Sequence, residues 1–313
     1  MASGTATEAP SPGILLVDKP GGMTSHDVVA RVRKAVGTRK VGHAGTLDPM
    51  ATGLLVIGVE AATRLLTYVV GADKTYLATI RLGQRTSTDD ADGEIVERAA
   101  PGAVAAIGVD RIDAAIAALT GRISQIPSAV SAIKVDGRRA YDRVRAGEEV
   151  VLAAREVTVS RFAVLADREA DGVRDLDVVV DCSSGTYIRA LARDLGADLG
   201  VGGHLTVLRR TRVGPFSVDG AAEVADLAGH TRLTPAEAAS LVLEPVAVTA
   251  EEARDLRHGK RLAGQRGRIS GGLAAAIDPA GELVGVVETR GDDLKSAMNM
   301  PTPAARGGAE AGG

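Results

Sequence analysis

The chain has 313 residues, of which 45% are apolar and 25% are charged, and its formal net charge is −3. This balance is typical of a globular protein with room for two domains of ordinary size, and it excludes disorder of the whole chain. Aromatic residues make up only 2%, so the core must consist mainly of Ala, Val, Leu and Ile. The net charge argues against a generally basic nucleic-acid-binding protein, although basic residues can still gather on one face.

Cysteine and histidine usage gives no sign of a disulfide or a metal site. Cys182 is the single cysteine, and the five histidines are scattered without the spacing of zinc ligands. No apolar run approaches the length of a membrane span, and residues 1–11 lack the basic start and apolar segment of a signal peptide. The sequence predicts a cytoplasmic protein with no metal and no membrane partner, and a disordered tail over residues 1–12.

The first ordered segment is a buried strand over residues 14–17, which runs into a turn. A helix follows, because Thr24 or Ser25 can cap its start and a stripe of apolar residues at spacing four lies along one side: Val28, Val32 and Val36. Two cations, Arg39 and Lys40, come directly after this helix. They indicate either a solvated surface or contact with phosphates.

An irregular loop over residues 42–50 carries one imidazole, His43, and one carboxylate, Asp48. Its glycines and proline are typical of a backbone that is neither helix nor strand. Because Pro49 restricts the preceding residue to extended conformations, the chain itself aims the Asp48 carboxylate. Taken alone, Leu-Asp-Pro is more often a simple turn.

The complete string Gly-His-x-Gly-Thr-Leu-Asp-Pro, followed by Ala-Thr-Gly-Leu-Leu, resembles the catalytic motif of the TruB family. These bacterial synthases convert uridine 55 of transfer RNA to pseudouridine. The resemblance implies that Asp48 is the catalytic aspartate and that His43 contacts the RNA near the extruded base. Residues 15–25 resemble the family's first motif, Leu-x-x-x-Lys-Pro-x-Gly-x-Thr-Ser, which assigns Lys19 to substrate binding. Arg64 departs from the family, in which a lysine is common at this position.

After a strand over residues 54–59 and a helix over residues 61–70, residues 74–82 alternate as a strand with Tyr76 on the inward face. An inward tyrosine is ordinarily a core residue. However, Lys-Thr-Tyr and the following Leu-Gly-Gln-Arg-Thr-Ser-Thr-Asp-Asp-Ala-Asp-Gly resemble the family's second motif. In that motif the tyrosine packs against the target base, and we adopt this role for Tyr76.

A basic segment follows a helix over residues 110–119. Residues 128–145 contain five basic and two acidic side chains, which predicts contact with RNA phosphates. A solvated surface is the alternative, but Gln-x-Pro-Ser-x-x-Ser-Ala-x-Lys resembles the mobile thumb of the synthases. We call residues 125–150 the thumb segment and expect it to contact RNA through Arg138, Arg139 and Arg143.

Strands over residues 157–165 and 176–182 lead into a glycine-containing turn and a helix. Tyr187 and Arg189 lie in its first turn, off the apolar stripe, where a strand, turn and helix N-terminus commonly present polar groups to an anion. An exposed arginine is the plainer interpretation. The string Cys-Ser-x-Gly-Thr-Tyr-Ile-Arg resembles a family motif in which the arginine pairs with the catalytic aspartate and the tyrosine approaches the sugar or base. Leu208, in a strand over residues 204–212, matches an apolar residue that packs against the target uridine.

The expected fold class is α+β. By resemblance, residues 13–240 form a pseudouridine synthase domain with a central mixed or antiparallel sheet flanked by helices. Residues 241–297, with short strands and glycine-rich turns, form a small β-rich domain of the PUA-like, RNA-binding kind. Residues 298–313 are expected to be a disordered tail.

The reaction implied by the resemblance is an isomerisation that needs no cofactor. Asp48 acts as a nucleophile at C1′ or C6 of the uridine, or as a base at C2′, and the sequence does not choose among these. The expected partner is the T arm of transfer RNA, with a monomeric enzyme and no guide RNA. A non-catalytic RNA-binding protein and a guide-dependent synthase are the alternatives, whereas a hydrolase would need a serine, cysteine or metal-ligand set that the sequence lacks.

Overall fold

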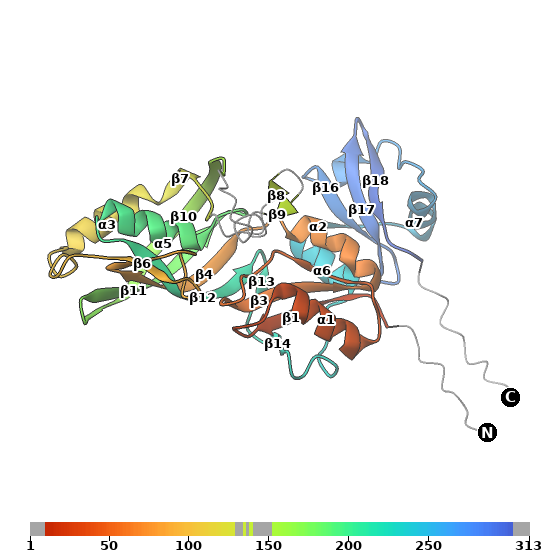
Figure 1. Ribbon diagram of the computed structural model, residues 1–313. Coiled ribbons are helices and arrows are strands. Elements are labelled where there is room, and N and C mark those ends of the chain that lie inside the picture. The colour runs from red at the N-terminus through yellow and green to blue at the C-terminus, as the bar shows by residue number, and fades with distance from the viewer. Residues whose placement is uncertain (1–9, 129–133, 136–137, 140–151, 303–313) are drawn as a thin grey trace, which may run out of the picture.

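The computed structural model describes residues 10–128, 134–135, 138–139 and 152–302. A ten-stranded mixed sheet runs through the larger part of the molecule (Figure 1), with a main strand order of β14-β1-β3-β12-β4-β11-β10-β7. Strand β2 pairs with β3, and β13 pairs with β12. The strands are β1 (Gly13–Lys19), β2 (Val41–Ala44), β3 (Thr52–Val59), β4 (Lys74–Leu82), β7 (Gly121–Gln125), β10 (Arg155–Ala170), β11 (Val173–Cys182), β12 (Gly203–Val213), β13 (Phe216–Ser217) and β14 (Ala222–Glu223).

Most neighbouring strands are antiparallel, while β1 with β14 and β3 with β12 are parallel. Two short two-stranded sheets are separate from it: β5 (Gln84–Thr86) with β6 (Ile95–Arg98), and β8 (Lys134–Val135) with β9 (Arg138–Arg139). The expected α+β class with a central mixed sheet is confirmed.

Helices cover different parts of the sheet and bury separate cores. Helix α1 (Ser25–Val36) packs on β1 and β3, while α3 (Val109–Ala118) and α5 (Ile188–Asp198) pack on β4, β11 and β12. The predicted start of α1 is confirmed, because Thr24 forms a capping box with Asp27. None of the helices that the structure describes is long and apolar enough to cross a membrane.

The helix expected over residues 61–70 is instead a 3₁₀ turn, Glu60–Leu65, followed by the short helix α2, Leu66–Val69. The chain reverses direction directly after β3, with Glu60 at a φ of 52°, and the Glu60 N–H donates to the Lys40 carbonyl at 2.7 Å. Thr38 and Lys40 also hold the Glu60 carboxylate. This tight reversal explains why the first turn is 3₁₀.

The C-terminal part forms a second, four-stranded sheet, as expected, with the order β15-β16-β17-β18. Its strands are β15 (Glu244–Ala247), β16 (Leu273–Ile277), β17 (Leu283–Arg290) and β18 (Asp293–Asn299), and α7 (Ala250–Arg257) and a 3₁₀ turn (Arg266–Arg268) complete it. Together with α6 (Pro235–Val242) and α2, its apolar side chains form one of the cores. Arg64 donates to the carbonyl of Asn299, so it joins the two parts of the chain.

One expected boundary is wrong. A disordered tail from residue 298 would exclude Met298 and Asn299 from the sheet, but both lie in β18. Met300 is only 6% exposed and belongs to the core shared with α2 and α6. The burial of Met300 fixes the strand that precedes it. Residues 1–9 and 303–313 of the expected tails lie outside the described residues.

Candidate active site

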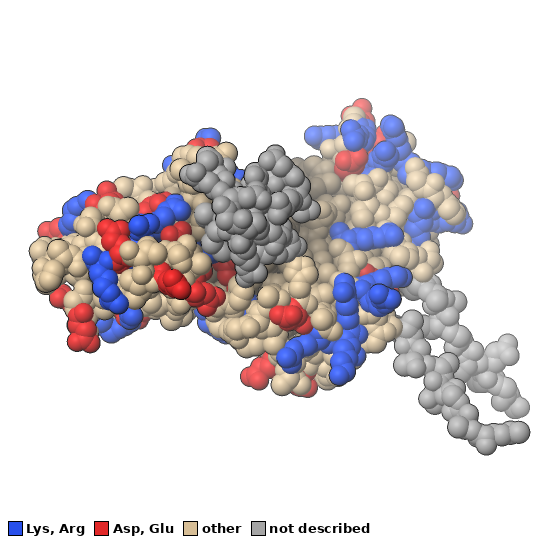
Figure 2. Space-filling model, viewed as in Figure 1, with Lys and Arg blue, Asp and Glu red and all other residues tan. Residues whose placement is uncertain are grey.

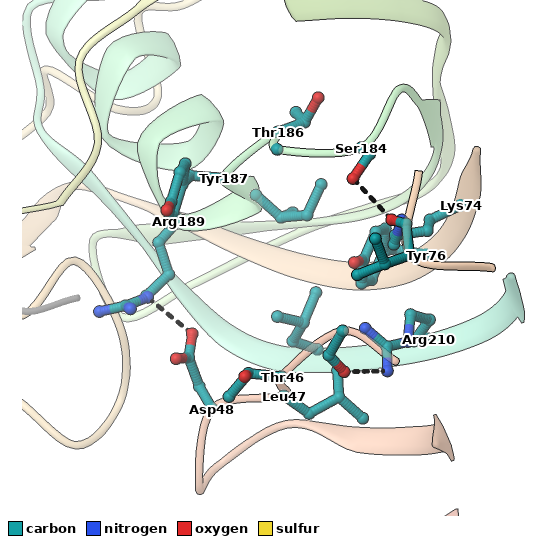
Figure 3. A pocket seen from close by; sticks show the side chains of 15 residues that line it. Thr46, Leu47, Asp48, Lys74, Tyr76, Ser184, Thr186, Tyr187, Arg189 and Arg210 are labelled. Carbon is teal, nitrogen blue, oxygen red and sulfur yellow. Dashed lines mark hydrogen bonds and ion pairs between the residues drawn. The ribbon is translucent and has the colours of Figure 1, made fainter. Parts of the chain in front are cut away.

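A pocket of about 290 Å³ opens where the loop after β2, strands β4 and β12 and the start of α5 meet (Figure 3). Its walls come from segments far apart in the sequence: Gly45, Thr46, Leu47, Asp48, Val70, Lys74, Tyr76, Ser184, Gly185, Thr186, Tyr187, Ile188, Arg189, Leu208 and Arg210. It therefore contains five of the residues that the sequence singled out: Asp48, Tyr76, Tyr187, Arg189 and Leu208.

The loop that carries Asp48, residues 45–51, is fixed on both sides of the carboxylate. On one side the Ser25 hydroxyl, 1% exposed, accepts from the Leu47 N–H at 2.9 Å and donates to the Leu47 carbonyl at 3.2 Å. On the other side the Pro49 carbonyl accepts from Lys19 Nζ at 3.2 Å and from the Gly22 N–H at 2.9 Å. These contacts hold the backbone of Asp48 before any substrate is present.

Arg210 supports the same loop from strand β12. Arg210 is 1% exposed, and its guanidinium donates to the carbonyls of Leu54 and Gly45, both at 2.9 Å. Gly53, at a φ of +99°, lets β3 approach closely, since a Cβ there would lie 2.2 Å from the Arg210 carbonyl oxygen. Burial of a guanidinium requires such hydrogen bonds, so Arg210 is part of the framework of the pocket.

Asp48 and Arg189 form the central ion pair (Figure 3). Arg189 Nε lies 3.0 Å from Asp48 Oδ2, and 36% of the Asp48 side chain remains exposed. Arg189 itself is 5% exposed. Burial raises the pKa of the Asp48 carboxyl, and the Arg189 guanidinium beside it opposes that shift. The pair thus places a carboxylate at the pocket with its counter-charge already bound.

Arg189 has a second acidic partner that the sequence did not single out. Its Nη1 lies 3.3 Å from Asp90 Oδ2 and donates to the Thr88 carbonyl at 3.0 Å. Asp90 lies in the Ser87–Gly93 turn, which we call the acidic turn. The motif that follows Tyr76 contains Asp90 and so could have indicated it as a site residue. However, three of the four residues 89–92 are acidic, and the sequence does not show which of them is buried.

Tyr76 and Leu208 form the apolar wall. Tyr76 is 7% exposed and Leu208 is 6% exposed, on neighbouring antiparallel strands where Ala78 faces Leu208 and Arg210 faces Tyr76. Burial raises the pKa of the Tyr76 hydroxyl, and the neighbouring Arg210 opposes that shift. The predicted inward position of Tyr76 is confirmed, and the wall suits a flat apolar group such as a nucleobase.

Tyr187 lies at the N-terminal boundary of α5, two residues before Arg189. It is half-buried. Its N–H donates to the Gln125 side-chain oxygen at 2.8 Å, and its carbonyl accepts from the Gln125 side-chain nitrogen at 3.0 Å.

Lys74 is another pocket residue that the sequence did not single out. It donates to the carbonyls of Ala72 at 2.6 Å and Val70 at 3.2 Å. Burial lowers its pKa.

Lys19 and His43 do not line this pocket. Lys19 is 0% exposed and donates to three carbonyls, those of Pro20, Met23 and Pro49, which uses all its donors. Burial lowers its pKa to about 8. Lys19 therefore holds the Asp48 loop in this structure, and its expected contact with substrate stays a prediction.

His43 lies in β2 opposite Ile57, and its ring meets His26 edge to face with centroids 5.7 Å apart. Burial lowers the pKa of His43, and its Nδ1 is buried without a hydrogen-bond partner among the described residues. Its contact with RNA stays a prediction. Arg138 and Arg139 form the backbone of β9, and Arg143 lies outside the described residues, so their phosphate contacts also stay predictions.

Family models match most of the chain. The N-terminal domain of TruB family pseudouridylate synthases matches residues 33–188, the C-terminal domain of tRNA pseudouridylate synthase B matches residues 189–252, and the C-terminal domain of tRNA pseudouridine synthase II matches residues 244–301.

Proteins named tRNA pseudouridine synthase B are close in sequence. The protein from Leifsonia xyli subsp. xyli is 62% identical over 292 residues, which cover 92% of this chain and 96% of that protein. The protein from Nocardia farcinica is 57% identical over 284 residues, 90% of this chain and 91% of that protein.

Solved structures share the fold. A chain in an H/ACA RNP bound to a substrate RNA containing 2′-deoxyuridine is 25% identical with a TM-score of 0.66, covering 93% of this chain and 85% of that chain. A chain in a Cbf5-Nop10-Gar1 complex is 26% identical with a TM-score of 0.66, covering 93% and 84%. With this pocket, these motifs and this extent of identity, the chain belongs to the TruB family of pseudouridylate synthases.

Proposed function

We propose that this enzyme converts uridine 55 in the T arm of transfer RNA to pseudouridine, with Asp48 as the reacting carboxylate. The observation that carries the proposal is the Asp48–Arg189 pair, 3.0 Å apart, beside the apolar wall of Tyr76 and Leu208. Relatives at 62% and 57% identity are named tRNA pseudouridine synthase B, which supports transfer RNA as the substrate.

The reaction is a balanced isomerisation. The bond from ribose C1′ to N1 of uracil breaks, the base turns, and C5 bonds to C1′; C5 loses a proton and N1 gains one. Asp48 attacks C1′ or C6, or accepts a proton from C2′, and each role requires the ionised carboxylate that Arg189 favours. The base must also be retained while it is detached, which is the task of the pocket wall.

A stacked uridine has to leave the RNA helix before it can reach this pocket. Extrusion costs a few kcal/mol and is offset by stacking and apolar contact in the pocket. Tyr76 and Leu208 supply a buried apolar wall, and Tyr187 faces the same space from the start of α5. These residues therefore hold the extruded base against Asp48.

The surrounding surface supplies cations for the RNA backbone. On the face in Figure 2, Lys and Arg predominate over α1 and the C-terminal domain, whereas acidic and basic side chains mix around α3. Arg39 is exposed just before the loop that carries Asp48, and Lys40 is exposed beside Glu60. We assign Arg39, Lys40, the thumb segment and the PUA-like C-terminal domain to RNA contact.

The test is incubation of the purified protein alone with an unmodified T-arm stem-loop, followed by carbodiimide mapping of pseudouridine. One modified position, equivalent to residue 55 of transfer RNA, is expected. A stem-loop with cytidine at that position is the control and gives no product. Absence of product without an added RNA or protein would contradict a stand-alone enzyme, and product at another uridine would contradict the site. Sedimentation of the same sample, where a monomer is expected, tests the oligomeric state.

A further inference from the structure

The start of the thumb segment is tied directly to the groups that hold Arg189. Residues 125–128, which we call the thumb base, continue from β7 and carry two almost fully buried polar side chains, Gln125 at 2% and Ser128 at 1% exposure. Buried polar groups of this kind are retained only where their hydrogen bonds are satisfied. Both residues make their hydrogen bonds to the two segments that position Arg189, the start of α5 and the acidic turn.

The first support is the start of α5. Gln125 Oε1 accepts from the Tyr187 N–H at 2.8 Å, and Gln125 Nε2 donates to the Tyr187 carbonyl at 3.0 Å. Tyr187 is the N-cap residue of α5 and has no side-chain cap of its own. Because Arg189 follows two residues later, the Gln125 amide fixes the turn of helix from which the guanidinium projects.

The second support is the acidic turn. The Ser128 hydroxyl donates to Asp89 Oδ2 at 2.6 Å. Asp89 has left-handed backbone geometry, at a φ of 61°, and this hydrogen bond holds its side chain. The neighbouring residues on the turn, Thr88 and Asp90, are the ones that bind Arg189 Nη1.

Arg193 strengthens the link between these parts. From the next turn of α5 its Nη2 donates to the Ile126 carbonyl at 2.8 Å, and its Nη1 lies 3.5 Å from Asp89 Oδ2. The thumb base, the acidic turn and α5 therefore form one hydrogen-bonded unit. Arg189 lies at its centre and presents Nε to Asp48 at 3.0 Å.

We propose that Gln125 and Ser128 are positioning residues, which set the orientation of Arg189, and thereby of the Asp48 carboxylate, from the base of the RNA-contacting segment. Neither residue lines the pocket. Their loss should therefore slow the chemical step and leave RNA affinity nearly unchanged, because the effect passes through Arg189.

The test compares single-turnover rates, with enzyme in excess over a T-arm stem-loop, for Ser128→Ala and Ser128→Thr. The alanine variant should lose about tenfold or more in rate at saturating enzyme with RNA affinity within about threefold, and threonine should restore most of the rate because it keeps the hydroxyl. Ser160→Ala is the matched control, since it removes one serine hydroxyl bonded to a carbonyl, that of Asp181, elsewhere on the sheet. It should leave the rate unchanged.

Gln125→Glu and Gln125→Met provide the second arm. Glutamate keeps the acceptor for the Tyr187 N–H but loses the donor, while methionine has similar length and loses both, so the rate should fall in the order Gln, Glu, Met. Melting temperatures of all variants separate positioning from folding. An unchanged rate in both alanine and methionine variants overturns the proposal. So does a rate loss that appears only as weaker RNA binding, or one that follows the melting temperature without rescue by threonine.

Discussion

Arg189 and Asp48 meet through Nε and Oδ2 at 3.0 Å, and Nη1 of the same guanidinium is held by Asp90 and the Thr88 carbonyl. Arg189 is thus fixed by partners other than Asp48. A guanidinium with several fixed partners has little freedom to turn away, so the carboxylate meets its counter-charge in one geometry. Arg189 is therefore held where it opposes the rise in pKa that burial imposes on the Asp48 carboxyl.

Asp48→Asn should abolish turnover while leaving RNA affinity within a few fold. Aspartate and asparagine side chains are nearly equal in size. The side chains of Ser25 and Lys19 hold the backbone of the loop around Asp48, and the substitution leaves these contacts intact. Only the negative charge is removed. Product formation is measured by carbodiimide mapping and affinity by filter binding. Pseudouridine well above background from the asparagine variant would remove Asp48 from the central role.

The pH at which activity is lost on acidification should depend on the cations around Asp48. Arg189 and Lys19 both lower the Asp48 pKa, and Arg189 does so more strongly. Removal of either cation raises that pKa, so the carboxylate is protonated, and activity disappears, at a higher pH. Single-turnover rates against pH should show a limb shifted upward in Arg189→Gln and, by less, in Lys19→Met. A downward shift in either variant would contradict the assignment.

Lys19→Met should lower stability without altering the salt dependence of RNA binding. Lys19 is 0% exposed and its ammonium donates to three carbonyls, so its removal takes one donor from each of them, at a cost of about 1–3 kcal/mol in the free energy of unfolding. Urea unfolding measures this decrease. A reduced salt slope with unchanged stability would instead restore direct contact with RNA phosphate.

Tyr76→Phe should retain much more activity than Tyr76→Leu. Phenylalanine keeps the ring and loses only the hydroxyl, whereas leucine removes a stacking surface worth about 1–3 kcal/mol per base. Initial rates on the stem-loop give the comparison. Equal inactivation of both variants would assign the function to the hydroxyl, and full activity of both with reduced stability would make Tyr76 a core residue.

Neutralising Arg138, Arg139 and Arg143 together should weaken RNA binding and flatten its dependence on salt. Each arginine that no longer neutralises a phosphate lowers the slope of log affinity against log salt by about one. Binding measured at several salt concentrations gives the slope. Arg161→Gln, which neutralises an exposed arginine on β10, is the control. A slope equal to that of the unchanged protein would mean that the thumb arginines are only a solvated surface.

Local sequence patterns were enough to predict most of the elements and several of the site residues. Alternation in residues 74–82 placed Tyr76 inward because successive side chains of a strand point to opposite faces. The capping residues before α1 placed its start, since they satisfy N–H groups only a few residues away. The ordered motifs singled out Asp48 and Arg189, which the structure brings together.

Which polar residues are buried, and what they bind, became clear from the folded chain. Periodicity reports the face on which a residue lies, but it does not report the distance to a segment a hundred residues away. Lys19 resembled a substrate-binding cation and is a buried support of the Asp48 loop, while Asp90 was one acid among several until packing placed it against Arg189. The burial of a charge depends on partners that the whole fold assembles, and local sequence does not encode those partners.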